Sequence, residues 1–384
     1  MKHISLAILL AATLLFPLRS SADEPGKKSL DEILPVRGLA IEAPKPQGLD
    51  EFLRFIEEEL APARFNLLIL RVDWNFEFQT HPELRDPSPL TVPDVKRIVE
   101  MCRRYGIRVV PQINLLGHQS WAKTTYALLR EYPQFDENPS VKTENYTGWP
   151  NPEGLYCKSY CPLHPDVHRV VFDVVDEICD AFESDAYHAG MDEVFYIGEK
   201  ECPRCNGRDK AELFAGEVTT LHNHLAEKNR ALMIWGDRLL DGKTTGLGEW
   251  EASFNNTHRA IDLIPKDVFI CDWHYERAEL TGVYFASKGL PVAECGYRNA
   301  GLCVQQIDDM VRFRTQCHPE TASRLQGYIH TIWSGNAGFL RSYYSIKNGS
   351  SGTAAPGREN RRRGADAEAL IAVMDRFKAL AAEE

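Results

Sequence analysis

Short runs of apolar residues recur along the chain and alternate with segments in which apolar positions repeat at helical spacing. The short runs do not alternate between apolar and polar positions, and several are rich in β-branched residues. This pattern is typical of parallel strands that are buried on both faces. The eight strands predicted in this way cover residues 38–41, 66–72, 108–113, 186–190, 231–235, 268–272, 291–293 and 328–333.

Helices are predicted between these strands. In one of them Phe52, Phe55 and Ile56 recur near helical spacing, and another begins with Pro93, which suits a first helical turn. The predicted helices cover residues 49–60, 93–105, 166–182, 210–228, 304–317 and 365–382. This alternating order predicts the α/β fold class with a single (β/α)8 TIM barrel. A doubly wound sheet is the alternative, but the chain has no GxGxxG or phosphate-loop motif to support it.

The first residues differ from the rest of the chain. Lys2 and His3 make a basic start, residues 6–18 form an apolar run, and small residues at 20–22 provide a cleavage site. This order predicts a signal peptide at residues 1–22, and therefore an exported protein that is periplasmic or secreted. The apolar run is too short to cross a bilayer, and no second long apolar stretch follows it.

The remaining residues are predicted to form one barrel with a C-terminal extension. The barrel covers residues 23–346. A flexible loop rich in Gly, Ser and Arg follows at 347–364, and a helix at 365–384 then packs on the barrel. Within the barrel, the long connection 117–165 is rich in Pro, Asn, Tyr and Gly, which predicts an active-site loop.

The net charge argues against two classes of partner, and the cysteines indicate a structural site. Without residues 1–22 the chain has 42 basic and 55 acidic residues, a formal net charge of −13, which argues against nucleic acid and against anionic membrane surfaces as partners. Among the ten cysteines, Cys157 and Cys161 form a CxxxC pair, and Cys202 and Cys205 form a CxxC pair. We predict a structural role for these four, either in disulfides or in a structural zinc site, and the connectivity stays open.

Two adjacent acids, Asp192 and Glu193, follow the fourth strand. Unpaired carboxylates beside buried surface cost free energy. Most enzymes that break glycosidic bonds use a pair of carboxylates. Other polar and aromatic residues fall near the remaining strands: Arg37, His118, Trp235, Asp237, Trp273, Tyr297 and Trp333. Tryptophan faces stack on sugar rings, while acids and arginine bind hydroxyls, so this set favours a carbohydrate substrate.

The motif His188-x-Gly190-x-Asp192-Glu193 resembles the HxGxDE signature of glycoside hydrolase family 20, the β-N-acetylhexosaminidases. Further segments are similar to the family's motifs and occur in its order, at residues 35–39, 110–118, 161–162, 235–237, 273 and 332–333. Two departures stand out. Many members carry an acid two residues after the last tryptophan, where this chain has Gly335, and the family's second-strand motif is replaced by residues 71–76.

The resemblance implies an exported glycosidase that removes terminal β-linked N-acetylhexosamine, GlcNAc or GalNAc, with retention and without a cofactor. The substrate's own acetamido carbonyl would be the nucleophile and would form an oxazolinium intermediate. Glu193 would be the general acid and later the base, and Asp192 would orient the acetamido group. The tryptophans would line the acetamido pocket, Tyr297 would bind the acetamido oxygen, and Arg37 would bind ring hydroxyls. His118 would lie beside them, and Asp237 occupies the position of the family's W-D-E segment.

The proposed roles of Asp192 and Glu193 require a particular backbone geometry and a particular state of protonation. Adjacent strand residues face opposite ways, so the chain must leave regular β geometry near Asp192 for both acids to reach one sugar. An ionised Asp192 would favour the protonated form of Glu193 by like-charge repulsion.

One alternative function is a degenerate barrel that binds amino sugars without cleaving them. Another is a different barrel hydrolase, metal-dependent, that uses His118, His188, Asp192 and Glu193, although no HxH or HExxH pairing supports it.

Overall fold

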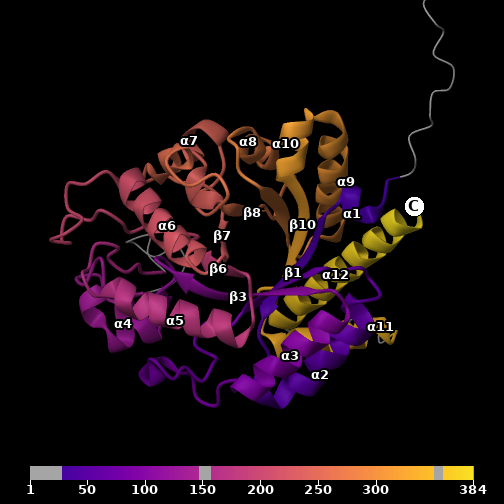
Figure 1. The fold of residues 1–384 in the computed structure, drawn as a ribbon, viewed down its shortest axis with the longest axis horizontal. Helices are drawn as coiled ribbons and strands as arrows, with labels where there is room; N and C mark the ends of the chain where they lie inside the picture. Colours follow the sequence, from indigo (N-terminus) through magenta and orange to yellow (C-terminus); the bar gives the residue numbers. More distant parts are fainter. Residues whose placement is uncertain (1–27, 147–156, 350–357, 384) are drawn as a thin grey trace, which may run out of the picture.

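Eight parallel strands close into a barrel in the described part of the chain (Figure 1). The structure is a computed structural model that describes residues 28–146, 157–349 and 358–383. The strands follow the order β1-β10-β9-β8-β7-β6-β3-β2 around the barrel. They are β1 (Val36–Glu42), β2 (Leu67–Arg71), β3 (Arg108–Leu115), β6 (Ala186–Gly190), β7 (Ala231–Trp235), β8 (Phe269–Trp273), β9 (Val292–Gly296) and β10 (Leu325–Thr331). Each predicted strand overlaps one of these, and the predicted (β/α)8 barrel is confirmed.

The interior of the barrel is filled by side chains of unequal size. Trp235 on β7 and Trp273 on β8 pack there against the small side chains of Cys271, Ala293 and Cys295. The other face of the strands contributes to the larger core beneath the helices. Because both faces of each strand are buried, the strands have unbroken apolar runs in the sequence.

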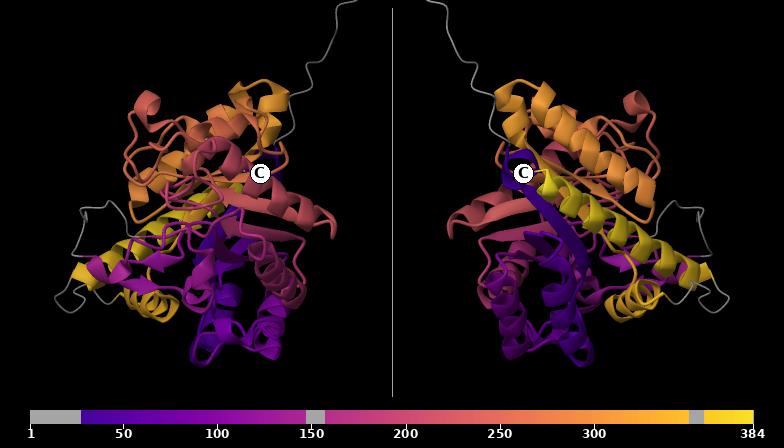
Figure 2. Two further views of the ribbon diagram at one scale, coloured as in Figure 1. Left: turned by 90° about the vertical axis from the view of Figure 1, so that its left-hand side faces the viewer. Right: turned by 90° about the vertical axis from the view of Figure 1, so that its right-hand side faces the viewer.

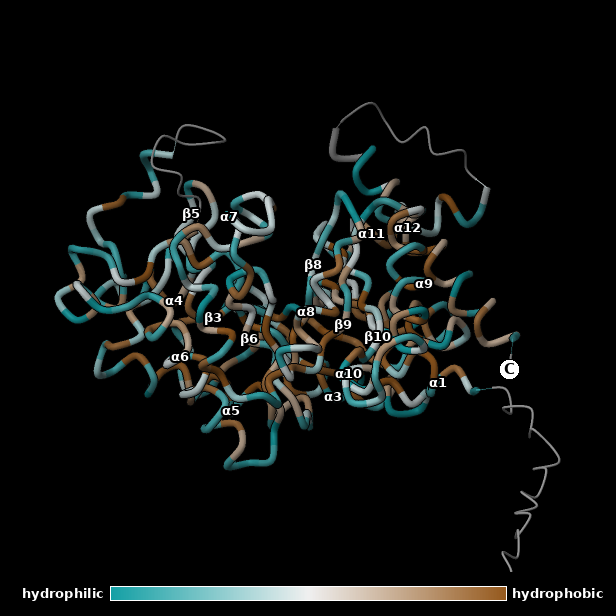
Figure 3. Tube along the Cα trace, turned by 90° about the horizontal axis from the view of Figure 1, so that it is seen from above, coloured by the Kyte–Doolittle hydropathy of each residue, from teal (hydrophilic) through white to brown (hydrophobic). Residues whose placement is uncertain are grey.

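Helices cover the outside of the barrel, and hydrophilic segments dominate its outer turns (Figures 1 and 3). Each predicted helix overlaps an observed one, while α8 and α11 were not predicted. The longer helices are α2 (Leu49–Phe55), α3 (Val92–Arg104), α5 (Val167–Ala181), α6 (Lys210–Ala226), α8 (Thr281–Ser287), α9 (Ala300–Gln316), α11 (Asn336–Lys347) and α12 (Arg358–Ala382). The short ones are α1 (Leu30–Ile33), α4 (Ala127–Glu131), α7 (Gly242–Thr245) and α10 (Pro319–Arg324). No described helix is long and apolar enough to cross a membrane.

The C-terminal helix α12 is longer than predicted. It begins at Arg358, so residues 358–364, which were expected in a flexible loop, are helical. The helix packs against α9 and α11 and runs diagonally across the molecule (Figure 2). A Cβ at Gly338 of α11 would lie 2.8 Å from Cζ of Arg363, so the arginine-rich start of α12 packs over α11. Residues 350–357 of the predicted loop and the predicted signal peptide lie outside the described residues.

The long connection from β3 to α5 folds back to its own beginning. It contains a small hairpin of β4 (Ser120–Trp121) and β5 (Thr124–Thr125), and residues 147–156 within it lie outside the described residues. The N–H of Gln119 donates to the carbonyl of Lys158 at 2.9 Å, and the N–H of Tyr160 donates to the carbonyl of Leu116 at 3.0 Å. These bonds hold the connection beside the carboxyl end of β3.

Candidate active site

The carboxyl ends of the strands surround a cavity of about 360 Å³. This is the face at which TIM barrels gather their functional groups. Four acids face the cavity: Asp192 and Glu193 after β6, Glu251 between β7 and β8, and Glu276 after β8. Its aromatic walls are formed by Trp121, Trp250, Trp273, Tyr275 and Trp333.

The backbone after β6 turns both acids of the pair toward one side. Gly190, Met191 and Glu193 adopt left-handed conformations with φ of 68°, 66° and 50°. The Nε2 atom of His118 lies 3.1 Å from Oδ2 of Asp192 and 3.0 Å from Oε2 of Glu193. The predicted departure from β geometry near Asp192 is therefore confirmed. Left-handed backbone at non-glycine residues costs free energy and is concentrated at functional sites.

Charge pairing dominates the environment of His118 and Asp192. Burial alone would lower the pKa of His118, but the carboxylate of Asp192 raises it well above its usual value. Burial alone would raise the pKa of Asp192, and the charge of His118 lowers it instead. The two side chains form a buried ion pair. The second oxygen of Asp192, Oδ1, is buried and accepts no hydrogen bond from the described residues.

Asp237 lies behind the cavity wall, where it holds neighbouring groups. Its Oδ2 accepts the N–H of Glu193 at 2.9 Å and Nε of Arg238 at 2.6 Å, and its Oδ1 accepts Nε1 of Trp273 at 3.2 Å. Burial raises the pKa of Asp237 to about 6 against the opposing charge of Arg238. Asp237 is 2% exposed and does not line the cavity, so the structure places it where it positions Glu193 and Trp273, and not at the predicted substrate contact.

The three predicted tryptophans occupy two levels. Trp273 and Trp333 line the cavity. Trp235 lies beneath them with no exposed surface, its ring centroid 5.7 Å from that of Trp333 and 4.6 Å from that of His188. Trp235 therefore supports the cavity from below and does not line it, which corrects its assignment as a substrate-binding residue.

The tyrosine in the cavity is Tyr275, where Tyr297 was predicted. The hydroxyl of Tyr275 accepts Nε1 of Trp333 at 2.8 Å. Tyr297 lies one layer farther out, with its ring centroid 5.2 Å from that of Tyr275. Alternation along an extended strand end puts Tyr275, two residues after Trp273, on the same side as that tryptophan. The sequence thus contained a signal for Tyr275.

A chain of contacts connects Tyr297 to the C-terminal helix. The guanidinium of Arg298 lies 4.2 Å from the ring centroid of Tyr297 and donates to its hydroxyl. Nε of Arg298 also donates to the buried Asp366 of α12 at 3.1 Å. Asp366 accepts a second hydrogen bond from Ser334, the residue after Trp333, at 2.8 Å. The last helix therefore contacts the outer side of the cavity wall.

The predicted arginine lies at the wrong end of the barrel. Arg37 is the second residue of β1, and its guanidinium donates to Asp31 and to the carbonyls of Leu34 and Arg64. It serves the amino-terminal rim, and its predicted role in substrate binding is wrong. At the carboxyl rim the arginine is Arg71, the last residue of β2, whose Cζ lies 4.7 Å from the ring centroid of Trp333.

No sequence pattern predicted the acids and aromatic rings that loops contribute to the cavity: Trp121, Trp250, Glu251 and Glu276. Glu251 is held from behind by His274, whose Nδ1 lies 2.6 Å from Oε2 of Glu251. On the other side of the ring, Nε2 lies 2.8 Å from Oγ1 of Thr281 and 3.1 Å from Oδ1 of Asp272. Burial lowers the pKa of His274, but Asp272 and Glu251 raise it to about 10.

The raised pKa of His274 predicts that the stability of the fold depends on pH. Because the pKa of His274 is about 10 in the folded chain and about 6.5 in the unfolded chain, its charge stabilises the fold fully below pH 6.5. That contribution is lost as the pH rises through about 10. We expect His274→Gln to cost more free energy of unfolding at about pH 7 than at about pH 10.5, as measured by urea unfolding. A pH-independent cost would show that only packing is lost.

The four predicted cysteines do not form one group. None of the ten cysteines, all of them in the described residues, forms a disulfide. Sγ of Cys157 approaches the carbonyl of Glu193 at 3.4 Å, and Cys157 forms a three-ligand cluster with His118 and Glu193. Cys161, Cys202 and Cys205 meet elsewhere with Glu137, in the second cluster of the described residues that offers metal ligands. The predicted grouping was therefore wrong for Cys157.

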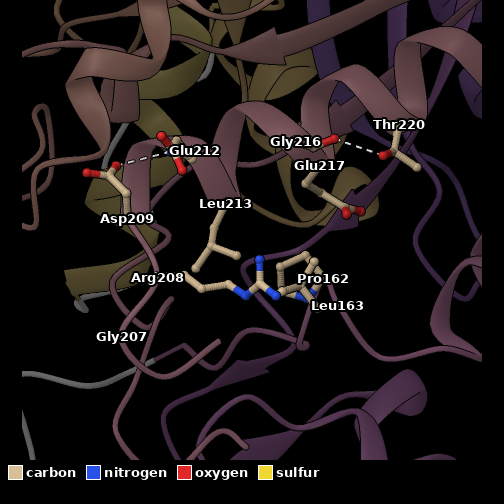
Figure 4. A pocket seen from close by; sticks show the side chains of 10 residues that line it. All are labelled: Pro162, Leu163, Gly207, Arg208, Asp209, Glu212, Leu213, Gly216, Glu217 and Thr220. Atoms are coloured by element: carbon tan, nitrogen blue, oxygen red, sulfur yellow. Dashed lines mark hydrogen bonds between the residues drawn. The ribbon is translucent and has the colours of Figure 1, made fainter. Parts of the chain in front are cut away.

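A second cavity of about 360 Å³ opens beside α6 (Figure 4). Arg208 extends toward Pro162 and Leu163 there, and Asp209 accepts the N–H of Glu212 at 3.2 Å at the start of the helix. No aromatic ring from the described part of the chain lines this cavity. Its wall is therefore unlike the aromatic and acidic wall of the cavity at the strand ends.

Comparison with known proteins identifies relatives of low identity. The lacto-N-biosidase of Bifidobacterium bifidum is 26% identical over 215 residues, which cover 52% of this chain and 17% of that protein. The beta-hexosaminidase of Emericella nidulans is 22% identical over 331 residues, which cover 79% of this chain and 50% of that protein. The chain spans half or less of the length of these relatives.

Two solved structures share the fold of this chain, and a family model matches most of its sequence. A chitobiase from Flavobacterium johnsoniae superposes with a TM-score of 0.59 at 19% identity, over 91% of this chain and 51% of that one. A beta-N-acetylhexosaminidase superposes with a TM-score of 0.60 at 19% identity, over 87% of this chain and 76% of that one. Both share the barrel fold. Residues 47–321 match the model of glycosyl hydrolase family 20, catalytic domain, and the chain belongs to that family.

Proposed function

We propose that this chain is a retaining glycosidase that removes terminal β-linked N-acetylhexosamine by substrate-assisted catalysis. The observation that carries the proposal is the difference between the two carboxylate oxygens of Asp192. Oδ2 of Asp192 is paired with His118, while its buried Oδ1 accepts no hydrogen bond from the described residues. An N–H from the substrate would satisfy that oxygen, since a buried acceptor without a donor costs free energy.

The proposed reaction divides the work between protein and sugar. Glu193 donates a proton to the leaving oxygen while the acetamido carbonyl attacks the anomeric carbon, giving an oxazolinium ion. Asp192 accepts the acetamido N–H and stabilises the positive charge that develops there. Glu193 then removes a proton from the attacking water, which restores the acid and gives a product of retained configuration.

The cavity wall suits a pyranose ring. Trp273, Tyr275 and Trp333 provide aromatic faces, and Glu251 and Glu276 provide carboxylates for sugar hydroxyls. A mutant beta-hexosaminidase of Streptomyces plicatus, solved in complex with its product GlcNAc, superposes on this chain with a TM-score of 0.54 at 15% identity. That ligand supports an N-acetylhexosamine as the substrate here.

Glu42 offers a replacement for the acid that Gly335 lacks. A Cβ at position 335 would lie 3.2 Å from Oε2 of Glu42, and this carboxylate accepts the N–H of Asn336 at 2.8 Å. Glu42, the last residue of β1, thus places a carboxylate beside the position at which many family members carry an acid, two residues after the last tryptophan. We propose that Glu42 substitutes for it at the edge of the sugar site.

A panel of aryl glycosides tests the proposal. We expect hydrolysis of aryl N-acetyl-β-glucosaminide or N-acetyl-β-galactosaminide, and a rate lower by about 10³-fold or more on the matching β-glucoside, which lacks the internal nucleophile. Asp192→Asn should reduce the first rate and leave the low second rate unchanged. Comparable rates on both sugars would contradict the mechanism. Tight binding of an N-acetylhexosamine thiazoline without turnover would instead favour an amino-sugar-binding barrel.

A further inference from the structure

A buried cluster of metal-ligating side chains lies outside the cavity. It consists of Glu137, Cys161, Cys202 and Cys205, hereafter the Cys3Glu cluster. Sγ of Cys161 lies 3.4 Å from Sγ of Cys202 and 3.5 Å from Sγ of Cys205. The four ligand atoms lie within 4.8 Å of one another, and each residue is at most 2% exposed.

The sulfur positions fit a tetrahedral metal better than a disulfide. A bonded pair requires about 2.05 Å between sulfurs, and any pairing among three thiols would leave one over. A zinc ion with Zn–S distances of about 2.3 Å holds its sulfurs about 3.7 Å apart, close to the separations here. The CxxC spacing of Cys202 and Cys205 is typical of such ligands.

Glu137 supplies an independent observation. It has no exposed surface, and its Oε1 accepts the N–H of Glu199 at 3.1 Å. Its other oxygen, Oε2, is buried and has no hydrogen-bond partner among the described residues. A buried carboxylate oxygen without a partner is costly, and a cation among the neighbouring sulfurs would remove that cost.

The backbone holds the ligands in place from three segments. The N–H of Glu137 donates to the carbonyl of Ser159 at 3.0 Å, and the N–H of Cys161 donates to the carbonyl of Phe135 at 2.6 Å. In the CxxC turn, the N–H of Asn206 donates to the carbonyl of Cys202 at 3.0 Å. These hydrogen bonds hold Glu137 and Cys161 in neighbouring backbone positions and shape the turn that carries Cys202 and Cys205.

We propose that the Cys3Glu cluster binds a structural Zn²⁺ ion. Three thiolates and one carboxylate complete a tetrahedral set, which leaves no open position for a substrate, and sulfur ligands favour zinc over magnesium or calcium. The thiol protons pass to solvent on binding. The ion would tie the β3–α5 connection to the loop between β6 and α6, which carries the acid pair. This inference does not rest on the proposed function.

Metal analysis of the full-length chain tests the site directly. The protein is purified under reducing conditions, equilibrated with zinc, passed through metal-free buffer and analysed by plasma mass spectrometry. We expect about one zinc per chain. Replacement by Co²⁺ should give thiolate-to-cobalt charge-transfer absorption and the visible bands of a tetrahedral site, a readout that does not depend on activity.

Matched variants separate this cluster from the other cysteines. Glu137→Gln and Cys202→Ser are expected to lower zinc affinity by about tenfold or more. Residues that only hydrogen-bond to a metal ligand already contribute that much to affinity. Cys157→Ser should leave the zinc content unchanged, because Cys157 lies outside the cluster. Absence of bound zinc in the reduced wild-type chain would overturn the proposal, as would a disulfide between any two of the three cysteines in mass spectra of the purified protein.

Discussion

Replacing Glu193 by Gln is expected to lower kcat for an aryl N-acetyl-β-glucosaminide by about 10²–10⁴-fold, the usual contribution of a general acid–base group. The amide keeps the shape of the side chain but cannot give its proton to the leaving oxygen. The N–H of Glu193 would still donate to Asp237, so the loop geometry should survive the change. Thermal unfolding should confirm that the variant is folded.

The leaving group provides the decisive measurement. A dinitrophenyl leaving group departs with little need for a proton, whereas a sugar leaving group needs one. The loss in kcat/KM should therefore be largest on a disaccharide and smallest on the dinitrophenyl glycoside. Glu249→Gln is the matched control, because Glu249 is exposed and should keep the wild-type rate. An equal loss on all substrates would assign Glu193 a role other than proton donation.

Replacing Gly190 by Ala is expected to destabilise the fold by about 2–5 kcal/mol. A Cβ at this position would lie 2.0 Å from Oδ1 and 3.1 Å from Cα of Asn114. Left-handed backbone, with φ of 68° at Gly190, costs about 1–2 kcal/mol for an L-residue, and overpacking costs about 1–3 kcal/mol more. Since Gly190 directly precedes the turn that aims the two acids, activity should fall as well.

Gly216 is the matched control for this substitution. It lies on the exposed side of α6, and a Cβ there would meet no atom within 4 Å. Gly216→Ala should therefore stabilise the chain by up to about 1 kcal/mol through helix propensity. Urea unfolding of both variants gives the comparison. If Gly190→Ala were as stable as the wild type, Asn114 would have to move away at no cost, and the argument for close approach would fail.

The barrel could be predicted from the sequence because its strands are buried on both faces. Such burial leaves a local signature, an unbroken apolar run, which requires no knowledge of the rest of the fold. Helix α11 had no comparable signature. Its buried residues, among them Phe339, Leu340 and Tyr343, pack against α12, which follows it, and against α2, which is distant in the chain.

The site was predictable to the level of the acid pair and less so beyond it. Asp192 and Glu193 end a strand together, and that signal is local. Arg37 and Arg71 both belong to parallel strands, and the place of each residue along its strand decides which one reaches the carboxyl rim: Arg37 stands near the start of β1 and Arg71 at the end of β2. Glu251 comes from a loop, and its position depends on His274, a contact that no spacing encodes.

The contacts of α12 also have a consequence for the order of events during synthesis. Asp366 binds Arg298 and Ser334, which lie directly behind Tyr297 and Trp333, and α12 follows every other described element in the chain. A ribosome releases the chain from its amino end, so the barrel strands emerge before α12 can make these contacts. The outer side of the cavity wall can therefore gain its contacts with α12 only after all eight barrel strands have been synthesised.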